Sequence, residues 1–381
     1  ALGDRRQESI GLRRLGIIAE NVGDKDKGEA YTRQALALHR ELGDRAQELN
    51  ALNNLGIWLA RSGRLEEAGD CLNEALALAE AIDSRDGIVK GIGALFGIYY
   101  RATGNYGAGL KFIEEQAAGE YAKNDEFIAL TAQMNQCLGL AAIGQFDKAL
   151  ELAQSLDSAI RRLLGQAYKR KAYEFLSYLY TETGRFAQAR QILAESRASL
   201  DSNSTATDHA DVLLSESYVA LQEGGAHDGQ PTKPAILRAG LDQAQQALSL
   251  LTGLQVENVD EQRANALHLA ARLCLELGDF EQALTYSTEV AGMLDKLPIL
   301  NWPEQILFTH ARALQAVGRD AEAGEYLRRA YNRVMLIADS LDDKTLRRSF
   351  LENVRQNRAI VQAWEEYQQK TRRQGDKEIG S

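Results

Sequence analysis

Few residues of this 381-residue chain stand in groupings that could perform chemistry. The five histidines are scattered and pair with no cysteine or carboxylate at the spacing of metal ligands: His39, His209, His227, His268 and His310. The three cysteines, Cys71, Cys137 and Cys274, lie far apart, in no metal or redox spacing and with no even-numbered disulfide framework. The sequence therefore predicts no catalytic residues, no metal site and no cofactor, and a chain that is not an enzyme.

Two segments have a superficial likeness to ligand-binding loops. Residues 104–111 are rich in glycine, but they lack the Gly-Lys-Ser/Thr ending of a phosphate loop and follow a helical pattern instead of a strand. Residues 24–28 begin like a calcium loop, but no ligand set continues through the twelfth position. Because both segments coincide with turns of a repeated unit, the sequence favours structural turns.

A cluster of basic residues lies between positions 161 and 171. Its members are Arg161, Arg162, Lys169, Arg170 and Lys171. Such a cluster could bind an anion, although a solvated helix face is the more common explanation. The sequence alone favours the solvated face.

The charge balance limits the classes of partner. With 44 Lys and Arg against 54 Asp and Glu, the formal charge is −10, whereas binding to nucleic acid needs a basic surface. No apolar run approaches the roughly 20 residues that span a bilayer, and we expect no signal peptide. We expect a cytoplasmic protein that binds neither membranes nor nucleic acid. Because Ala1 stands within helical sequence, we also expect a piece of a longer protein.

Glycines recur along the chain at a period of about forty residues. They stand at Gly23, Gly63, Gly104, Gly144, Gly184, Gly224, Gly278 and Gly318, with spacings of 40, 41, 40, 40, 40, 54 and 40. The first of only four prolines is Pro231, which is typical of a succession of helices, since proline breaks helix interiors. The regular period predicts a repeat architecture, and the long interval predicts an insertion near 225–236.

Each recurring glycine separates two segments whose apolar residues are three or four apart, as on one face of a helix. A small residue in the first segment has a small partner twelve residues later, as in Gly56 with Ala68 and Gly97 with Gly109. Small side chains at both places let two helices approach to about 8 Å. The glycine between them supplies a left-handed turn. We therefore predict an all-α chain of about eight helical hairpins.

The fourth repeat fits the pattern poorly, because Gln133 and Gln136 occupy positions where leucines belong. A local phase shift would place Met134, Leu138 and Leu140 inside instead. The alternative is a buried polar pair that serves a ligand.

The two ends of the array differ in the sequence. Residues 1–335 are predicted to form the repeats, and residues 336–368 to form capping helices over the last hydrophobic face. Leu346, Phe350, Ile360 and Trp364 have the spacing to cover that face. Residues 369–381 are polar and charged and are predicted to form a flexible tail.

These residues resemble the tetratricopeptide repeat, which has Leu-Gly in its first helix and alanines in its second. The closest copies are Asn54-Leu55-Gly56 with Ala68 and Ala75, and Leu15-Gly16 with Gly28 and Ala35. The resemblance covers about residues 9–335 and implies an α-α superhelix. The usual repeat has 34 residues; the longer form is similar to the repeats of bacterial signalling ATPases related to the maltose-regulon activator, of kinesin light chains and of peptide-sensing regulators.

The resemblance also implies a binding groove lined by the first helix of each hairpin. The positions that it assigns to ligand contact include Arg13, Asn50, Asn53, Arg61, Arg101, Lys171, Tyr178, His268, Arg272 and Arg312. All the assigned positions together hold six basic and five acidic residues, the latter being Glu20, Glu174, Glu182, Asp211 and Glu276. The first three repeats are the most positive. We therefore expect an extended or helical segment of acidic character, bound between about Arg13 and Arg101.

Several functions fit this architecture. The resemblance favours a protein- or peptide-binding module that serves as the sensor or scaffold arm of a larger bacterial signalling protein. A stand-alone receptor for a peptide and a structural assembly adaptor are the alternatives. The sequence does not choose between the groove and the convex face as the contact surface.

Overall fold

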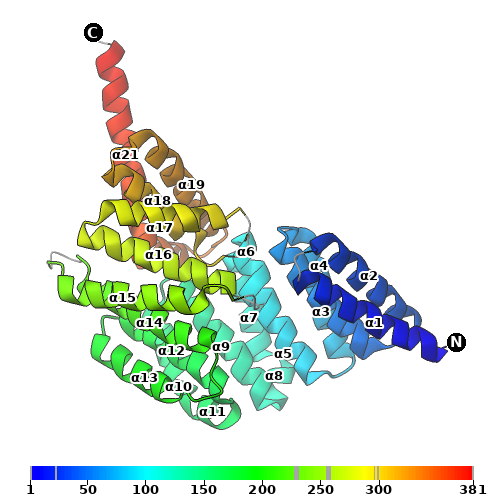
Figure 1. The fold of residues 1–381 in the computed structure, drawn as a ribbon. Coiled ribbons are helices and arrows are strands. Elements are labelled where there is room, and N and C mark those ends of the chain that lie inside the picture. The colour runs from blue at the N-terminus through cyan, green and yellow to red at the C-terminus, as the bar shows by residue number, and fades with distance from the viewer. Residues whose placement is uncertain are drawn as a thin grey trace. The chain divides into compact units, whose positions relative to one another are not determined.

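The computed structural model describes residues 2–21, 24–226, 231–254, 259–295, 297 and 300–379 (Figure 1). The described residues form helices and no β-strand, which confirms the predicted all-α fold. Contacts between Cα atoms divide the chain into two compact units. Unit 1 comprises Ala1–Gln136 with Leu297–Ile299, and unit 2 comprises Cys137–Lys296 with Leu300–Ser381.

Unit 1 contains the first three hairpins. Their helices are α1 (Leu2–Asn21), α2 (Lys25–Glu41), α3 (Arg45–Arg61), α4 (Leu65–Ala81), α5 (Arg85–Ala94), the π-helix η1 (Leu95–Tyr100), α6 (Arg101–Thr103), α7 (Tyr106–Ala118) and the short α8 (Glu120–Asn124). Helix α9 (Glu126–Ala142) follows. Polar side chains accept the free N–H groups at several helix starts, as Asp24, Asp44, Ser84 and Asn105 do for the residues three positions ahead.

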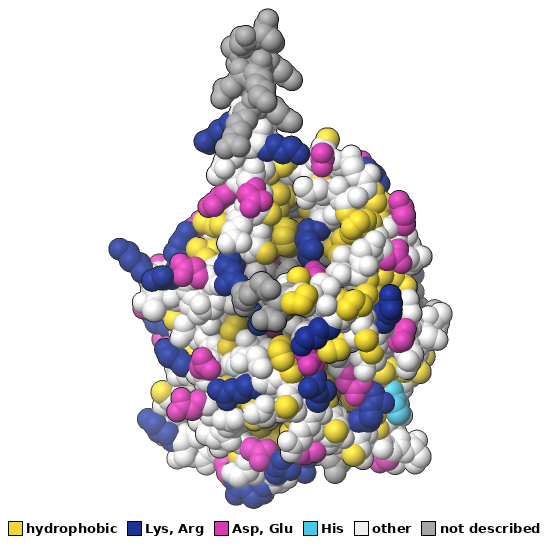
Figure 2. Space-filling view, turned by 90° about the vertical axis from the view of Figure 1, so that its left-hand side faces the viewer, with side chains coloured by type: hydrophobic (Ala, Val, Ile, Leu, Met, Phe, Trp, Pro, Cys, Tyr) yellow, Lys and Arg dark blue, Asp and Glu magenta, His cyan; other side chains and the backbone are white. Residues whose placement is uncertain are grey.

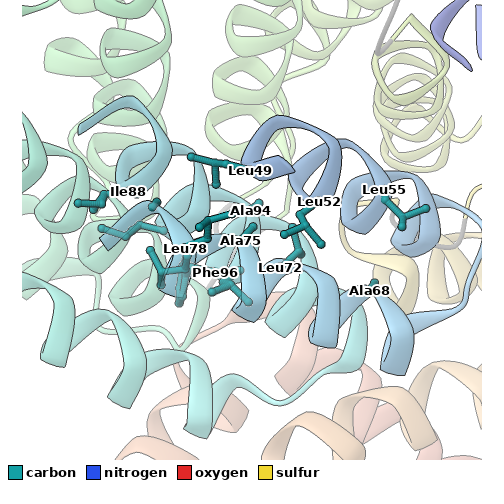
Figure 3. Packing of buried hydrophobic residues seen from close by; sticks show 14 of the residues in the cluster. Leu49, Leu52, Leu55, Ala68, Leu72, Ala75, Leu78, Ile88, Ala94 and Phe96 are labelled. Carbon is teal, nitrogen blue, oxygen red and sulfur yellow. The ribbon is translucent and has the colours of Figure 1, made fainter. Parts of the chain in front are cut away.

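The core of unit 1 follows the predicted apolar periodicity. Leu52, Leu55 and Leu72 are fully buried between α3 and α4 (Figure 3). Gly56 faces the second helix so closely that an added Cβ would lie 2.7 Å from the Leu72 side chain and 3.3 Å from the Ala68 carbonyl oxygen. The predicted close approach of the two helices is therefore confirmed in the second repeat.

The third repeat departs from this packing. Helices α3 and α5 begin forty residues apart, at Arg45 and Arg85, but the second helices α4 and α7 begin 41 residues apart, at Leu65 and Tyr106. The extra residue thus lies inside the first helix, where the wider turns of η1 accommodate it.

This insertion changes which residues face the second helix of the third repeat. A Cβ at Gly97 would meet nothing within 4 Å, whereas a Cβ at Gly109 would lie 2.9 Å from Tyr100 and 3.4 Å from Phe96. The predicted pairing of Gly97 with Gly109 is therefore wrong. The extra residue turns Gly97 out of the hairpin and places aromatic rings against Gly109.

Unit 2 contains the remaining hairpins and the C-terminal helices. After α9 come α10 (Phe146–Ser155), α11 (Asp157–Leu163), α12 (Gln166–Glu182), α13 (Phe186–Ala198), α14 (Ala206–Gly224), α15 (Pro234–Leu251), α16 (Val259–Leu277), α17 (Phe280–Met293), α18 (Pro303–Ala316), α19 (Asp320–Asp339), α20 (Lys344–Glu352) and α21 (Arg355–Ile379). From α12 to α19, neighbours in the chain pack against each other as successive hairpins (Figure 1).

The recurring glycines adopt the predicted left-handed conformation with one exception. The φ angles of Gly63, Gly104, Gly144, Gly184, Gly278 and Gly318 lie between 73° and 81°. Gly224 instead ends α14, and an added Cβ there would lie 3.0 Å from the Leu237 side chain. The prediction is therefore wrong at Gly224, which is the last residue of α14. Gly23 and residues 227–230 of the insertion lie outside the described residues.

Two further predictions concern α9 and the C-terminal helices. Leu138 is 42% exposed, so the phase shift proposed for the fourth repeat is wrong for that residue, and Gln133 and Gln136 are half-buried. At the C-terminus, Trp364 of α21 stacks on Tyr331 of α19, with ring centroids 5.5 Å apart. Helix α21 continues to Ile379, past the predicted start of the tail at residue 369.

The different surroundings of Gly56 and Gly97 lead to opposite predictions for alanine substitutions. Gly56→Ala should lower the free energy of unfolding by about 1–3 kcal/mol, because its Cβ overlaps Leu72. Gly97→Ala should raise it by up to about 1 kcal/mol, because alanine lowers the entropic cost of forming a helix and meets open space. Urea unfolding followed by circular dichroism measures both. Equal destabilisation by the two variants would contradict the placement of the π-helix.

Candidate functional site

Five of the residues predicted to contact a ligand lie in unit 1, and we call them the N-terminal polar face. Arg13 is on α1, Asn50, Asn53 and Arg61 are on α3, and Arg101 begins α6. Four of them are half-buried, whereas Asn53 is only 5% exposed. On α3 the exposed and half-exposed stripe runs through Asn50, Asn54, Ile57 and Arg61, so Asn53 lies at its flank.

The amide of Asn53 is buried without a protein partner. Neither its Nδ2 nor its Oδ1 forms a hydrogen bond with a protein group. Leaving a buried polar group unpaired costs about 1–3 kcal/mol, and such groups are rare in folded proteins. An amide offers both donors and an acceptor, which is the pattern needed to pair with the backbone of an extended chain.

Two further groups in unit 1 share this property. The Nε of Arg13 is buried without a protein partner, and so are both ring nitrogens of His39 on α2. Burial lowers the pKa of His39, and the nearby charge of Arg13 adds to this effect against the attraction of Asp44 and Glu48. Sequence analysis missed His39, which it noted only as one of several scattered histidines.

Two glycines leave the backbone of the third repeat open. Gly93 stands forty residues after Asn53, at the equivalent position of the next repeat, and Gly97 follows it by four residues. An added Cβ at either glycine would meet nothing within 4 Å. A helix without side chains at these positions allows another main chain to approach closely.

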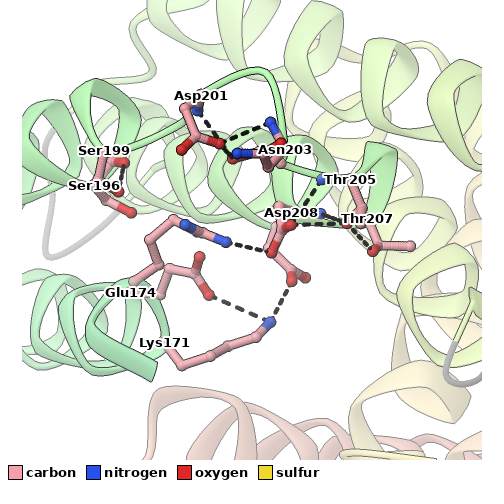
Figure 4. Close-up of polar contacts among 12 residues, drawn as sticks. Lys171, Glu174, Ser196, Ser199, Asp201, Asn203, Thr205, Thr207 and Asp208 are labelled. Atoms are coloured by element: carbon pink, nitrogen blue, oxygen red, sulfur yellow. Dashed lines mark hydrogen bonds and ion pairs between the residues drawn. The ribbon is translucent and has the colours of Figure 1, made fainter. Parts of the chain in front are cut away.

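In unit 2 the predicted contact residues pair with one another across neighbouring helices (Figure 4). The ammonium of Lys171 on α12 forms ion pairs with Asp211 on α14 and, at 3.6 Å, with Glu174. Gln262 of α16 donates from Nε2 to Asp211 Oδ1 at 2.7 Å. We call these four residues, together with the rings and arginines described next, the unit 2 polar network.

The aromatic part of this network centres on Tyr178. The centroid of its ring lies 6.3 Å from that of Phe146, 6.2 Å from that of Phe175 and 5.6 Å from that of Tyr218. The hydroxyl of Tyr218 donates to Glu182, and burial raises its pKa well above the usual value. The aromatic cluster thus joins side chains of α10, α12 and α14.

Basic residues complete the network on α16 and α18. Arg272 is only 7% exposed, and burial lowers its pKa, against the attraction of Tyr218 and Glu182. Arg312 pairs with Glu276 at 3.4 Å. His268 is hydrogen-bonded to Thr309 at 3.0 Å, and burial together with the charge of Arg272 lowers its pKa to about 3, so it is neutral at physiological pH.

The structure also corrects the interpretation of the basic cluster at 161–171. Arg170 is 7% exposed and pairs at 2.7 Å with Asp208, whose carboxylate also accepts from the backbone N–H of Thr205. Arg161 pairs with Asp157 at 2.8 Å and lies over the Tyr173 ring. The cluster is therefore not a plain solvated face.

The described part of the chain was predicted to hold neither a metal site nor a membrane-spanning segment, and the structure bears on both. No group of three or more His, Cys, Asp or Glu side chains there could hold a metal ion. Among the same residues, no helix is both long and apolar enough to cross a membrane. The face drawn in Figure 2 carries basic and acidic side chains close together, with hydrophobic side chains between them.

Comparison with known proteins identifies the fold. A family model described as tetratricopeptide repeat matches residues 8–81. The matched residues cover the first two repeats. A Rap protein solved in complex with Competence and Sporulation Factor has a TM-score of 0.52 and 14% identity over 89% of this chain and 99% of that one.

Two other solved structures are also similar to this chain. The apo quorum sensor NprR from B. thuringiensis has a TM-score of 0.48 and 14% identity over 86% of this chain and 87% of that one. A Signal Transduction ATPase with Numerous Domains from Pyrococcus horikoshii, which has a tetratricopeptide-repeat sensor, has a TM-score of 0.48 and 13% identity over 89% of this chain. The chain spans 46% of that ATPase. No curated protein sequence matches.

The unit 2 polar network predicts a dependence of stability on pH. Burial raises the pKa of the Glu174 carboxyl from 4.5 to about 7; the charge of Asp211 adds to this shift, and Lys171 opposes it. Because the folded chain holds a proton that the unfolded chain releases, this group should stabilise the fold below about pH 4.5. That stability should be lost as the pH rises to about 7.

The free energy of unfolding should fall between pH 5 and 8, and Glu174→Gln should make this fall smaller by about 1–3 kcal/mol. Urea unfolding at several pH values measures the slope. Glu66→Gln, which removes an exposed carboxyl on α4, is the control and should leave the slope unchanged. A Glu174→Gln variant with the wild-type slope would show that this carboxyl does not titrate in the range.

Proposed function

We propose that the protein is a non-enzymatic module that binds a peptide or an extended protein segment along the N-terminal polar face. The observation that carries the proposal is the Asn53 amide, which is buried in α3 with both its nitrogen and its oxygen unpaired. The N–H and C=O groups of one extended ligand residue would satisfy both atoms at once when the side chain turns toward the exposed stripe of α3. The open backbone at Gly93 and Gly97 would let a main chain approach the next repeat.

The charges of this face favour an acidic ligand. Arg13, Arg61 and Arg101 bring three positive charges to one part of a chain whose formal charge is −10. Arginine holds carboxylates through two parallel hydrogen bonds, which gives both strength and orientation.

The proposed role is that of the sensor or scaffold arm of a larger bacterial signalling protein in the cytoplasm. This proposed role rests on the resemblance between the forty-residue repeats of this chain and the repeats of signalling ATPases. A stand-alone peptide receptor is the second candidate. It is supported by the similarity of the fold to that of the Rap protein solved with Competence and Sporulation Factor. A ligand that changes the shape of the array would act by preferring one of its conformations.

A charge-reversal experiment tests the ligand class. Fluorescent twelve-residue peptides of net charge −4, 0 and +4 serve as probes, and fluorescence anisotropy measures binding. We expect the acidic set to bind best and Arg61→Glu with Arg101→Glu to weaken its binding by at least about tenfold, as the loss of charged hydrogen bonds implies.

The matched control is Arg328→Glu with Arg348→Glu, which changes the net charge equally at exposed arginines of α19 and α20. This control should keep the affinity for the acidic peptides. Equal losses of affinity in both double variants would show that overall charge alone causes the effect. That result would contradict a site on the N-terminal polar face.

The unpaired amide gives a second prediction, in which stability and binding change in opposite directions. Asn53→Leu should raise the free energy of unfolding by about 1–3 kcal/mol, because it replaces an unpaired buried amide with an apolar side chain of similar size. The same variant should weaken peptide binding. Asn54→Leu, at the exposed neighbouring position, is the control for both measurements. An Asn53→Leu variant that loses stability would show that the amide has a structural role.

A further inference from the structure

The C-terminal helices of unit 2 reach back to repeats that are far away in the sequence. Asn353, between α20 and α21, donates from Nδ2 to the carbonyl oxygen of Gly144 at 3.1 Å, across 209 residues of chain. Arg355, at the start of α21, donates from Nη1 to Gln222 Oε1 of α14 at 3.2 Å. The same segment therefore touches the fourth and the sixth repeats.

Gly144 is fitted to this contact as well as to its own turn. An added Cβ there would lie 2.8 Å from the Ser349 carbonyl oxygen, 3.0 Å from Asn353 Cβ and 3.2 Å from Val354 Cγ2. At Gly184, Gly278 and Gly318, which have similar positive φ angles, an added Cβ would meet nothing within 4 Å. The absence of a side chain is therefore needed twice at Gly144, once for the turn and once for the approach of the C-terminal segment.

The segment is held together by its own polar contacts. Asn353 Nδ2 also donates to Ser349 Oγ at 3.0 Å, and Asn357 Nδ2 donates to the carbonyl oxygen of Phe350 at 3.0 Å. Phe350, Asn357 and Ile360 are buried. These contacts link α20 to the start of α21, so that the segment can move as one piece.

The far end of this segment is anchored in a different way. Trp364 lies between the rings of Tyr331 and Tyr367, with centroids 5.5 Å and 5.6 Å away, and Tyr367 packs against Gly324 of α19. These three rings are half-buried, and each stacked pair adds to the stability that burial of the rings provides. In contrast, the contacts with Gly144 and Gln222 include two hydrogen bonds, each of which changes an equilibrium about two- to tenfold. The two ends of the segment are therefore held in different ways: one by stacked rings, the other by hydrogen bonds to distant repeats together with the buried side chain of Phe350.

We propose that residues 341–358 form a latch that closes unit 2 between its first and last repeats and can open while α21 stays packed on α19. In an array of repeats each hairpin contacts only its neighbours, so its curvature is free to vary unless distant repeats are tied together. The latch ties the turn at Gly144 to the end of the array. It gives unit 2 two states, closed and open, and a partner that prefers one of them shifts the balance.

Hydrogen exchange of the full chain, measured by mass spectrometry, tests the latch. Gly144→Ala should speed exchange of the amides in 341–358 at least tenfold, because its Cβ overlaps the Ser349 carbonyl oxygen. Amides in 331–338 and 361–367 should keep their protection, since the Trp364 stack is untouched. Gly184→Ala carries the same backbone strain in a turn with open space and should leave 341–358 as in the wild type. Equal effects of the two variants, or no faster exchange in Gly144→Ala, would overturn the proposal.

A second set of variants keeps the test decisive if Gly144→Ala does not fold. Asn353→Ala and Arg355→Ala each remove one hydrogen bond to the early repeats and should speed exchange in 341–358 about two- to tenfold. Arg358→Ala removes a hydrogen bond to the Glu352 carbonyl oxygen, within the segment itself. It serves as the matched control. Faster exchange in 138–150 should accompany opening in the first two variants only. The same response in all three variants would show local fraying in place of a latch.

Discussion

The contact between the two helices of each hairpin is the constraint on which the rest of the structure depends. Where Gly56 faces Leu72 and Ala68, the helices lie so close that a single added carbon would overlap the neighbour. This approach fixes the rotation of the first helix, and the rotation decides which side chains turn away from the core. On α3 it leaves Asn50, Asn54 and Arg61 on the exposed stripe and Asn53 at its edge. The polar face is thus a consequence of packing on the opposite side of the helix.

Much of this could be predicted from the sequence, because the period, the turn glycines and the apolar spacing are local signals. The third repeat shows where such signals fail. A spacing of 41 in place of 40 reveals one extra residue in the third repeat. From the sequence alone, a longer loop between the helices and a wider turn inside the first helix accommodate that residue equally well. Only the packing of Phe96 and Tyr100 against Gly109 decides for the π-helix. The prediction of a left-handed turn at Gly224 fails for a related reason. The residue type fits the repeat, but α14 continues through this glycine, and the insertion follows it.

In the candidate site, likewise, the position of a residue could be predicted from the sequence, but its interaction partner could not. The sequence could place Lys171, Tyr178 and Arg272 on one side of their helices, but not say which charges are already paired. A usable signal exists, because stacked repeats bring equivalent positions together. Lys171 and Asp211 are forty residues apart, as are Glu261 and Asn301, so opposite or complementary groups one period apart are expected neighbours. No such rule finds the contact of Asn353 with Gly144, which spans several repeats and depends on the shape of unit 2 itself.

The two units therefore use polar residues in different ways. In unit 2 the polar network pairs its charges internally, and a ligand would have to break existing contacts such as that between Arg312 and Glu276 before making its own. In unit 1 the cost of leaving Asn53, His39 and Arg13 with unpaired atoms is already part of the folded state. A ligand that pairs with them recovers that cost as binding energy. The proposed ligand of unit 1 would therefore gain from pairing with these atoms, whereas a ligand of the unit 2 polar network would first have to replace existing ion pairs.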